Sequence, residues 1–429
     1  MTAAASRDFS LSANLPGSLA HKLLVCVLVS IMWQAAQADA EDPRPSMFSF
    51  NGFGTAGVVH SSEAQADFTS SVFKPNGAGY SHNWSVDVDS RIGAQLTADI
   101  TPQLSAVVQV IAEQGYDNTY KPNVEWANVK YQFTSDFGVR LGRIELPTFL
   151  VSDFRKVGYA NPWVRPPNEV YGVAPLTNND GVDVSYRLHF GDITNTLRGA
   201  YGSSYKLNFP GIVVDTHNLW GIFDTAEYAA VVFHASYLQA KATVDPPSPL
   251  FGAFRQFGPA GIAIADTYEL SNRSVSIVTF GASYDPGGWF AMSEWTRIRS
   301  HSFLGVNTAW YVSGGYRIGK FTPYITSSQI TASKASDSGL AAADFPAEFA
   351  GTIAALDAGL DTTLASTSHI QRSNSVGGRW DIAKNIDLKL QYDRTRIGAD
   401  STGTLINIQP GFKQDDTVNI FSATVDFVF

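Results

Sequence analysis

Apolar and polar side chains alternate one by one over long stretches of this chain. In residues 84–98 the apolar side chains fall on even positions, from Trp84 to Ala98, while polar or small residues fill the odd positions. The same alternation recurs in 127–133, 182–190, 386–393 and 421–429. Because successive side chains of an extended chain point to opposite faces, each stretch predicts a β-strand with one apolar and one polar face.

This period of two predicts an all-β chain of about sixteen strands, an even number. The predicted segments are 47–60, 83–99, 104–115, 123–133, 137–144, 181–190, 193–203, 217–225, 228–243, 274–285, 288–300, 308–319, 321–333, 370–382, 386–398 and 417–429. Short links alternate with long ones, which lie near 61–82, 145–180, 244–273, 334–369 and 399–416. Such alternation is typical of transmembrane antiparallel β-barrels of the outer membrane, with the short turns in the periplasm.

The last strand ends on Phe429, and its apolar face is rich in aromatic residues. This ending resembles the closing strand of bacterial outer-membrane barrels, in which the terminal aromatic residue is also read by the assembly machinery. A barrel leaves no open edge, so we expect the last strand to pair with the first, residues 47–60. The apolar faces would then meet lipid, and the polar faces would line a lumen.

The amino-terminal residues predict a secretory signal peptide in 1–40. Arg7 and Lys22 precede an apolar run, 23–33, which is followed by small residues that allow cleavage after Ala38 or after Ala40. The remaining residues, 41–429, then form a single barrel domain. The only cysteine, Cys26, lies in the leader, so the mature chain has no disulfide and no thiolate metal site.

Composition narrows the choice of function. The net charge is −9, and residues 1–40 carry two basic and two acidic residues, so their removal leaves it unchanged. Such a chain has no basic surface for nucleic acid. No linker divides it, and its 36 glycines and 12% aromatic residues suit many strands and turns. Residues 340–364, rich in alanine, are either a short amphipathic helix or a mobile loop in an external link.

Together these features resemble the general porins of Gram-negative bacteria, which are trimeric, sixteen-stranded diffusion channels. The resemblance covers residues 41–429 in architecture and implies a homotrimer in the outer membrane. In that family the link after the fifth strand folds into the barrel, where its acidic residues face basic residues on the opposite wall. The matching link, about 145–180, carries Glu145, Asp153, Glu169 and Asp180, and departs from the family pattern by carrying Arg155, Lys156 and Arg165.

Basic residues on the polar faces of the strands are candidates for the wall of this constriction. They are Arg91, Lys130, Arg140 and Arg187. A basic side chain facing lipid at mid-bilayer costs roughly 2–4 kcal/mol, so these side chains should point to water. Arg394 and Arg396 have the opposite parity and face outward. They either bind phosphates of lipopolysaccharide or lie in solvated strand above the lipid.

Motifs of enzymes are weak or absent in the sequence. Residues 52–57 match G-x-G-x-x-G but fall inside the first strand, where small residues favour close packing. No H-E-x-x-H or G-x-S-x-G occurs. We therefore expect no enzyme and no cofactor, but a passive pore for small hydrophilic solutes and ions, with membrane lipid and lipopolysaccharide as neighbours. The alternative is a substrate-selective channel with a binding ladder built from aromatic residues of the inward link: Phe149, Phe154, Tyr159, Trp163 and Tyr171. An enzyme barrel or an adhesive role is less favoured.

Overall fold

The computed structural model describes residues 46–429, apart from 175, 210–211, 247 and 334–336. The predicted signal peptide, residues 1–40, lies outside the described residues. Residues Met47–Val428 form a unit of their own. Among the residues described, no helix has the length and apolar character needed to cross a membrane.

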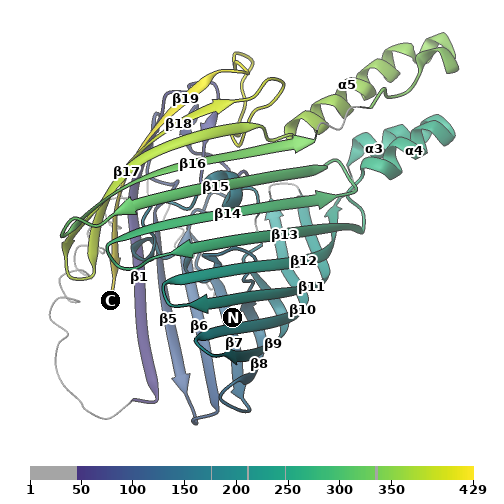
Figure 1. Ribbon diagram of the computed structural model, residues 1–429. Coiled ribbons are helices and arrows are strands. Elements are labelled where there is room, and N and C mark those ends of the chain that lie inside the picture. Colours follow the sequence, from purple (N-terminus) through teal and green to yellow (C-terminus); the bar gives the residue numbers. More distant parts are fainter. Residues whose placement is uncertain (1–45, 175, 210–211, 247, 334–336) are drawn as a thin grey trace, which may run out of the picture. The chain divides into compact units, whose positions relative to one another are not determined.

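Sixteen long strands of the described chain pair antiparallel in chain order and close into a barrel (Figure 1). The closing pair joins β1 (Phe48–Ser61) to β19 (Thr417–Val428), as the sequence predicts. The strands between them are β5 (Arg91–Asp99), β6 (Leu104–Glu113), β7 (Asn123–Gln132), β8 (Phe137–Glu145), β9 (Asn178–Phe190), β10 (Ile193–Phe209), β11 (Ile212–Tyr228), β12 (Val231–Asp245), β13 (Arg273–Tyr284), β14 (Trp289–Ser300), β15 (Val306–Tyr316), β16 (Phe321–Ser333), β17 (Gln371–Ala383) and β18 (Ile386–Ile397).

The predicted strand 83–99 is broken in the structure. The link between β1 and β5 contains β2 (Asp67–Phe68), β3 (Ala78–Gly79) and β4 (Trp84–Ser85), and residues 86–90 leave the ladder. Two contacts hold this break. The Ser90 hydroxyl accepts a hydrogen bond from the Gly57 amide at 3.0 Å, and the Asp89 carboxylate pairs with Arg165 from inside the barrel. Side-chain contacts within the lumen thus override an alternation that continues in the sequence.

Several other boundaries also differ from the prediction. The inward link spans 146–177 rather than 145–180, because the ladder between β8 and β9 continues through Arg143 and Asp180, whose side chains form two hydrogen bonds of 2.7 and 2.8 Å. The strands β10 and β11 are much longer than 193–203 and 217–225. The pairing of β10 with β11 shifts register after Gly202, so the two strands continue although the alternation in the sequence is interrupted there.

The glycine-rich segment 52–57 serves packing at the closing seam. The Phe53 side chain is buried, and its ring lies where a side chain on Gly93 of β5 would be. The ring of Phe427 on β19 occupies the corresponding space over Gly54. The absence of side chains at these two glycines lets aromatic rings fill both sides of β1. The prediction that this motif is part of a strand and serves close packing is confirmed.

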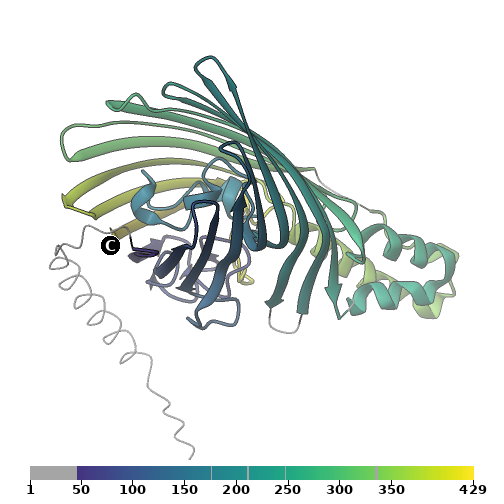
Figure 2. The same ribbon diagram turned by 90° about the horizontal axis from the view of Figure 1, so that it is seen from below.

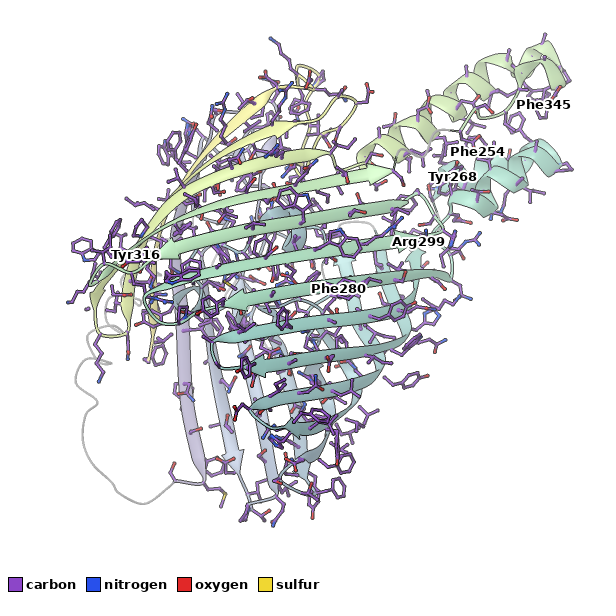
Figure 3. All side chains as sticks on the ribbon, viewed as in Figure 1. Phe254, Tyr268, Phe280, Arg299, Tyr316 and Phe345 are labelled. Carbon is purple, nitrogen blue, oxygen red and sulfur yellow. The ribbon has the colours of Figure 1, made fainter. Side chains whose placement is uncertain are left out.

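The outer face of the barrel is apolar, with aromatic side chains near the short-link end. The exposed aromatic residues close to the short links include Tyr131, Phe133, Tyr186, Phe190, Tyr228, Tyr284, Trp289, Tyr316, Phe321 and Trp380. Figure 3 shows Tyr316 at this end of β15, with Phe280 further along the wall on β13. Aromatic residues at the borders of an apolar band are typical of barrels that sit in a bilayer.

Two long links form a helical protrusion at the other end of the barrel (Figure 2). One link contains α3 (Pro249–Phe254), η3 (Arg255–Phe257) and α4 (Gly258–Tyr268), and the other contains η4 (Ala342–Asp344), η5 (Ala347–Phe349) and α5 (Ala350–Ser366). Their apolar faces pack together, with Phe254, Tyr268 and Phe345 in the contact (Figure 3). Of the two interpretations of 340–364, the helix is therefore the correct one, although α5 begins at Ala350 rather than at 340.

The closing seam gives a first prediction. A Gly93→Ala change places a methyl group against the Phe53 ring, and overpacking of this kind costs about 1–3 kcal/mol. We expect the folded barrel of this variant to unfold at a lower temperature than the native sequence, measured as the temperature at which the heat-modifiable, folded band is lost on electrophoresis. The matched control is Gly199→Ala on β10, where a methyl group meets nothing within 4 Å. Equal effects of the two substitutions would contradict this account of the seam.

Candidate pore lumen and its inward loop

The link after the fifth long strand lies inside the barrel. Residues 146–177 leave β8, cross the lumen and contact the wall on the far side. Trp163 Nε1 donates a hydrogen bond to Ser313 Oγ of β15 at 2.7 Å, and the Ser236 hydroxyl of β12 donates to the Thr148 carbonyl at 2.7 Å. The predicted inward fold of this link is confirmed, and residues 146–177 are called the inward loop below.

Apolar packing holds the inward loop against β14, β15 and β16. The loop contains η1 (Ser152–Phe154), η2 (Gly158–Ala160) and α2 (Asn168–Tyr171). Its buried apolar side chains join those of the wall in one cluster: Phe149, Val151, Trp163, Val170 and Tyr171 from the loop, with Phe290, Ala309, Tyr311, Tyr324 and Ile330 from the wall. Burial of so many large side chains removes much apolar surface from water, which stabilises the loop in this position.

Two carboxylates behind the loop act as hydrogen-bond acceptors. Glu294 of β14 accepts from the Leu150 amide at 2.8 Å and from the Tyr171 hydroxyl at 2.6 Å. Glu169 of α2 accepts from Ser328 and from Gln371, both at 2.7 Å. Both carboxylates are buried, and neither forms an ion pair with a cation of the described chain. These groups lie on the wall side of the loop.

The loop is also tied to the closing seam. Lys389 Nζ of β18 donates to the Gly158 carbonyl at 2.6 Å and pairs with Asp426 at 3.0 Å. The Arg379 guanidinium lies over the Tyr159 ring, 4.6 Å from its centroid, and pairs with Asp387 at 3.1 Å. Asp381 also pairs with Arg379, at 2.9 Å, so this part of the lumen holds two cations and three carboxylates.

An opening of about 320 Å³ remains between the inward loop, the link before β5 and the wall of β5 to β8. Four of the predicted residues line it: Arg91 on the wall, and Arg155, Lys156 and Arg165 on the loop. Lys156 Nζ contacts Glu113 and Glu125, both at 2.9 Å, and Arg91 lies 3.9 Å from Glu113. Arg165 is buried against Asp89 at 2.6 Å. The basic residues of the loop therefore face the opening or support its edge.

A second group of predicted residues lies nearer the short-link end of the same wall. Arg140 of β8 and Arg198 of β10 share two carboxylates: Asp183, at 2.9 and 3.1 Å, and Glu145, at 2.7 and 3.1 Å. Lys130 of β7 lies opposite Arg140 in the ladder. This arrangement is called the lower cluster.

The remaining predicted residues are distributed around these two groups. Arg187 lies on β9, closer to the short link, and is exposed. Asp153 is exposed on η1 and Glu169 is buried behind the loop. Asp180 pairs with Arg143 on the wall. The structure thus collects most of the predicted residues along one side of the lumen but turns Glu169 away from it.

Several residues of the opening could not be predicted from the sequence. Glu113 and Glu125 lie at the ends of predicted strands, and their contact with Lys156 brings together residues 31 and 43 positions apart. Lys74 lies in the link before β5, where alternation gives no information, and donates a hydrogen bond to the Gln114 carbonyl. Burial lowers the pKa of Lys74 below its usual value, the nearby cations Lys156 and Arg91 add to this effect, and Glu113 opposes it.

The described residues contain no group of three or more His, Cys, Asp or Glu side chains placed to hold a metal ion. Most of the charged groups around the water-accessible opening instead form ion pairs. Such an arrangement sets a local field at the narrow part of a channel, which acts on ions and dipolar solutes.

Comparison with known proteins shows the fold. The outer-membrane channel DcaP of Acinetobacter baumannii aligns over 91% of this chain and all of its own, with 11% identity and a TM-score of 0.53. OmpF of Salmonella typhi, solved with daunomycin, aligns over 89% of this chain and 97% of its own, with 12% identity and a TM-score of 0.51. No protein-family model and no curated protein matches the sequence. The chain has the barrel fold of these porins, as its resemblance to them predicts.

The anchoring of the inward loop gives a second prediction. Glu294→Ala removes the acceptor of the Leu150 amide and the Tyr171 hydroxyl, and a buried donor left without its acceptor costs about 1–3 kcal/mol. We expect a loosened loop, seen as faster tryptic cleavage after Arg155 or Lys156 in the folded protein. The control is Glu227→Ala at the exposed end of β11, with an unchanged cleavage rate. Identical rates for both variants would contradict an anchoring role for Glu294.

Proposed function

We propose that this protein is an outer-membrane pore through which small hydrophilic solutes and ions diffuse passively. The observation that carries the proposal is the contrast between an apolar outer face and a lumen with a charged, water-accessible opening of about 320 Å³. The porin fold of DcaP and OmpF supports it. Diffusion through such an opening needs no catalytic step and no cofactor. The short links then lie in the periplasm and the helical protrusion outside the cell.

The constriction is formed by the inward loop and the wall of β5 to β9. On this proposal Arg91, Lys130, Arg140 and Arg187 are its basic wall. Asp153, Arg155, Lys156, Arg165 and Glu169 form the loop side, with Glu169 behind the loop. Glu145 and Asp180, predicted as loop residues, belong to the wall, because they lie on β8 and β9. A substrate-selective channel with an aromatic ladder is the less favoured alternative, because Phe149, Trp163 and Tyr171 are buried against the wall.

A homotrimer is the assembly that suits this barrel. The strands β5 to β8 have nine or ten residues, whereas β10 and β11 have seventeen. The wall made of β5 to β8 is therefore the shortest part of the barrel along the strand direction. Its outward side chains are apolar and exposed, among them Leu96, Val108 and Leu141. A low apolar wall can pack against another copy, which would cover it from lipid.

The outer face of β17 to β19 suits an anionic membrane lipid such as lipopolysaccharide. Arg372 lies opposite Arg396 in the ladder, and with Arg394 these exposed side chains border a hollow of about 390 Å³. Arg396 is 3.2 Å from Asp415, the only carboxylate that lines this hollow among the described residues. A second, apolar hollow of about 450 Å³ lies further along the same strands, beside Tyr392 and Phe421. The two hollows match a phosphate group and an acyl chain.

Conductance across a planar bilayer tests the function. The refolded protein should give open channels, and a trimer should close in three equal steps. Arg140→Ala removes one positive charge from the lumen, so we expect the permeability ratio of chloride to potassium to fall. The expected fall is about threefold, the effect of one unit charge on an ion a few ångströms away in water. The control is Lys320→Ala in an exposed short link. Absence of any channel would contradict the pore, and an unchanged ratio in Arg140→Ala would contradict the wall assignment alone.

Lipid retention tests the outer arginines. Replacement of Arg372, Arg394 and Arg396 by Gln should lower the amount of phosphate-bearing lipid that native mass spectrometry finds on the purified protein. Each basic side chain near an anionic membrane surface contributes about 1 kcal/mol, so the loss should be large. Lys413→Gln, in the exposed link before β19, serves as the control. Lipid retention in the triple variant equal to that of the native sequence would contradict the lipid site. Loss of the trimer in this variant would instead indicate that the three arginines lie in a contact between subunits.

A further inference from the structure

The charged side chains around the opening are unequal in number. Seven basic and three acidic side chains line it. Two of the basic residues pair with carboxylates just outside the lining: Arg143 with Asp180 at 2.7 Å, and Arg165 with Asp89 at 2.6 Å and with Asp393 at 3.6 Å. Even with these three carboxylates included, the basic groups outnumber the acidic ones.

The ion pairs show where the excess lies. Lys121 pairs with Asp117 at 3.1 Å at the rim, and Lys156 uses both Glu113 and Glu125. Two basic side chains then remain without a carboxylate at ion-pair distance in the described part of the chain, Lys74 and Arg155. Lys74 donates to a backbone carbonyl, that of Gln114. Arg155 contacts the Tyr171 carbonyl at 3.4 Å and lies 5.8 Å from the centroid of the Tyr171 ring.

The lower cluster continues this pattern. Lys130 and Arg187 form no ion pair with any described residue, whereas Arg140 and Arg198 share their two carboxylates. Near this cluster, the acidic side chain without an ion pair among the described residues is Asp153. Its negative charge offsets only one of the two unpaired positive charges, those of Lys130 and Arg187. A solute that passes along this side of the lumen meets an excess of positive charge at both levels.

The acidic residues that would balance this charge are used elsewhere. Glu169 and Glu294 are buried on the far side of the inward loop, where they accept hydrogen bonds from the loop and the wall. Asp387, Asp393 and Asp426 of β18 and β19 pair with Arg379, Arg165 and Lys389 in the lumen. The acidic residues of the surface links are screened by salt beyond about 8 Å. The net charge of −9 therefore says little about the field in the opening.

We propose that the opening favours small anions bearing a carboxylate or phosphate group, which contact Lys74 and Arg155 as they pass. The inference rests on the pore function proposed above and adds the sign of its selectivity. Both cations line the opening, and low-dielectric walls on either side strengthen their field. An anion at this point gains attraction without breaking an existing ion pair.

Reversal potential under a potassium chloride gradient tests this selectivity in the complete, refolded protein. We expect the chloride-to-potassium permeability ratio of the native sequence to exceed one. Arg155→Gln and Lys74→Gln should each lower the ratio about threefold, the factor expected of one unit charge a few ångströms away in water. Inorganic phosphate should reduce the chloride current in a saturable way, and less so in the two variants.

The matched control is Lys384→Gln, which removes a basic charge from the exposed link between β17 and β18. Its ratio should equal that of the native sequence. Open channels with a potassium preference would overturn the inference and leave the pore intact, whereas absence of channels would overturn both. Because the native ratio alone decides the sign, the test does not depend on folding of the variants. Equal ratios in all three variants would also overturn the role of Lys74 and Arg155.

Discussion

Pairing of β1 with β19 is the constraint on which the rest of the structure depends. A strand edge in lipid leaves backbone groups without partners, and only a closed sheet pairs them all. Closure then separates the side chains by parity, apolar outward and polar inward, and creates the lumen. Phe53 and Phe427 fit against Gly93 and Gly54 at this seam, so the small residues of β1 serve the same constraint.

The inward loop divides the polar interior into two environments. Behind it, large apolar side chains and buried carboxylates bind the loop to β14 to β17. In front of it, basic side chains outnumber the carboxylates around the opening. The loop is therefore anchored on one face and basic on the other. If the proposed pore function holds, anchoring and ion selectivity depend on different residues of this one segment.

The pattern of the sequence predicted most of the strands because alternation is a local property of each segment. It placed Arg91, Lys130 and Arg140 on the polar faces correctly, since parity alone fixes the side on which a strand residue points. It failed where long-range contacts decide. Asp89 leaves the ladder to meet Arg165, 76 residues away, and Lys74 reaches the opening from a link without periodicity.

The sequence by itself determined an all-β chain of sixteen strands, the pairing of its ends and the presence of a long link after the fifth strand. These features follow from side-chain period and link length, which need no knowledge of distant residues. Only the tertiary structure decided which charges neutralise one another. Glu169 turns to the wall and Glu113 to Lys156, because ion pairing depends on distances across the lumen that no spacing along the chain encodes.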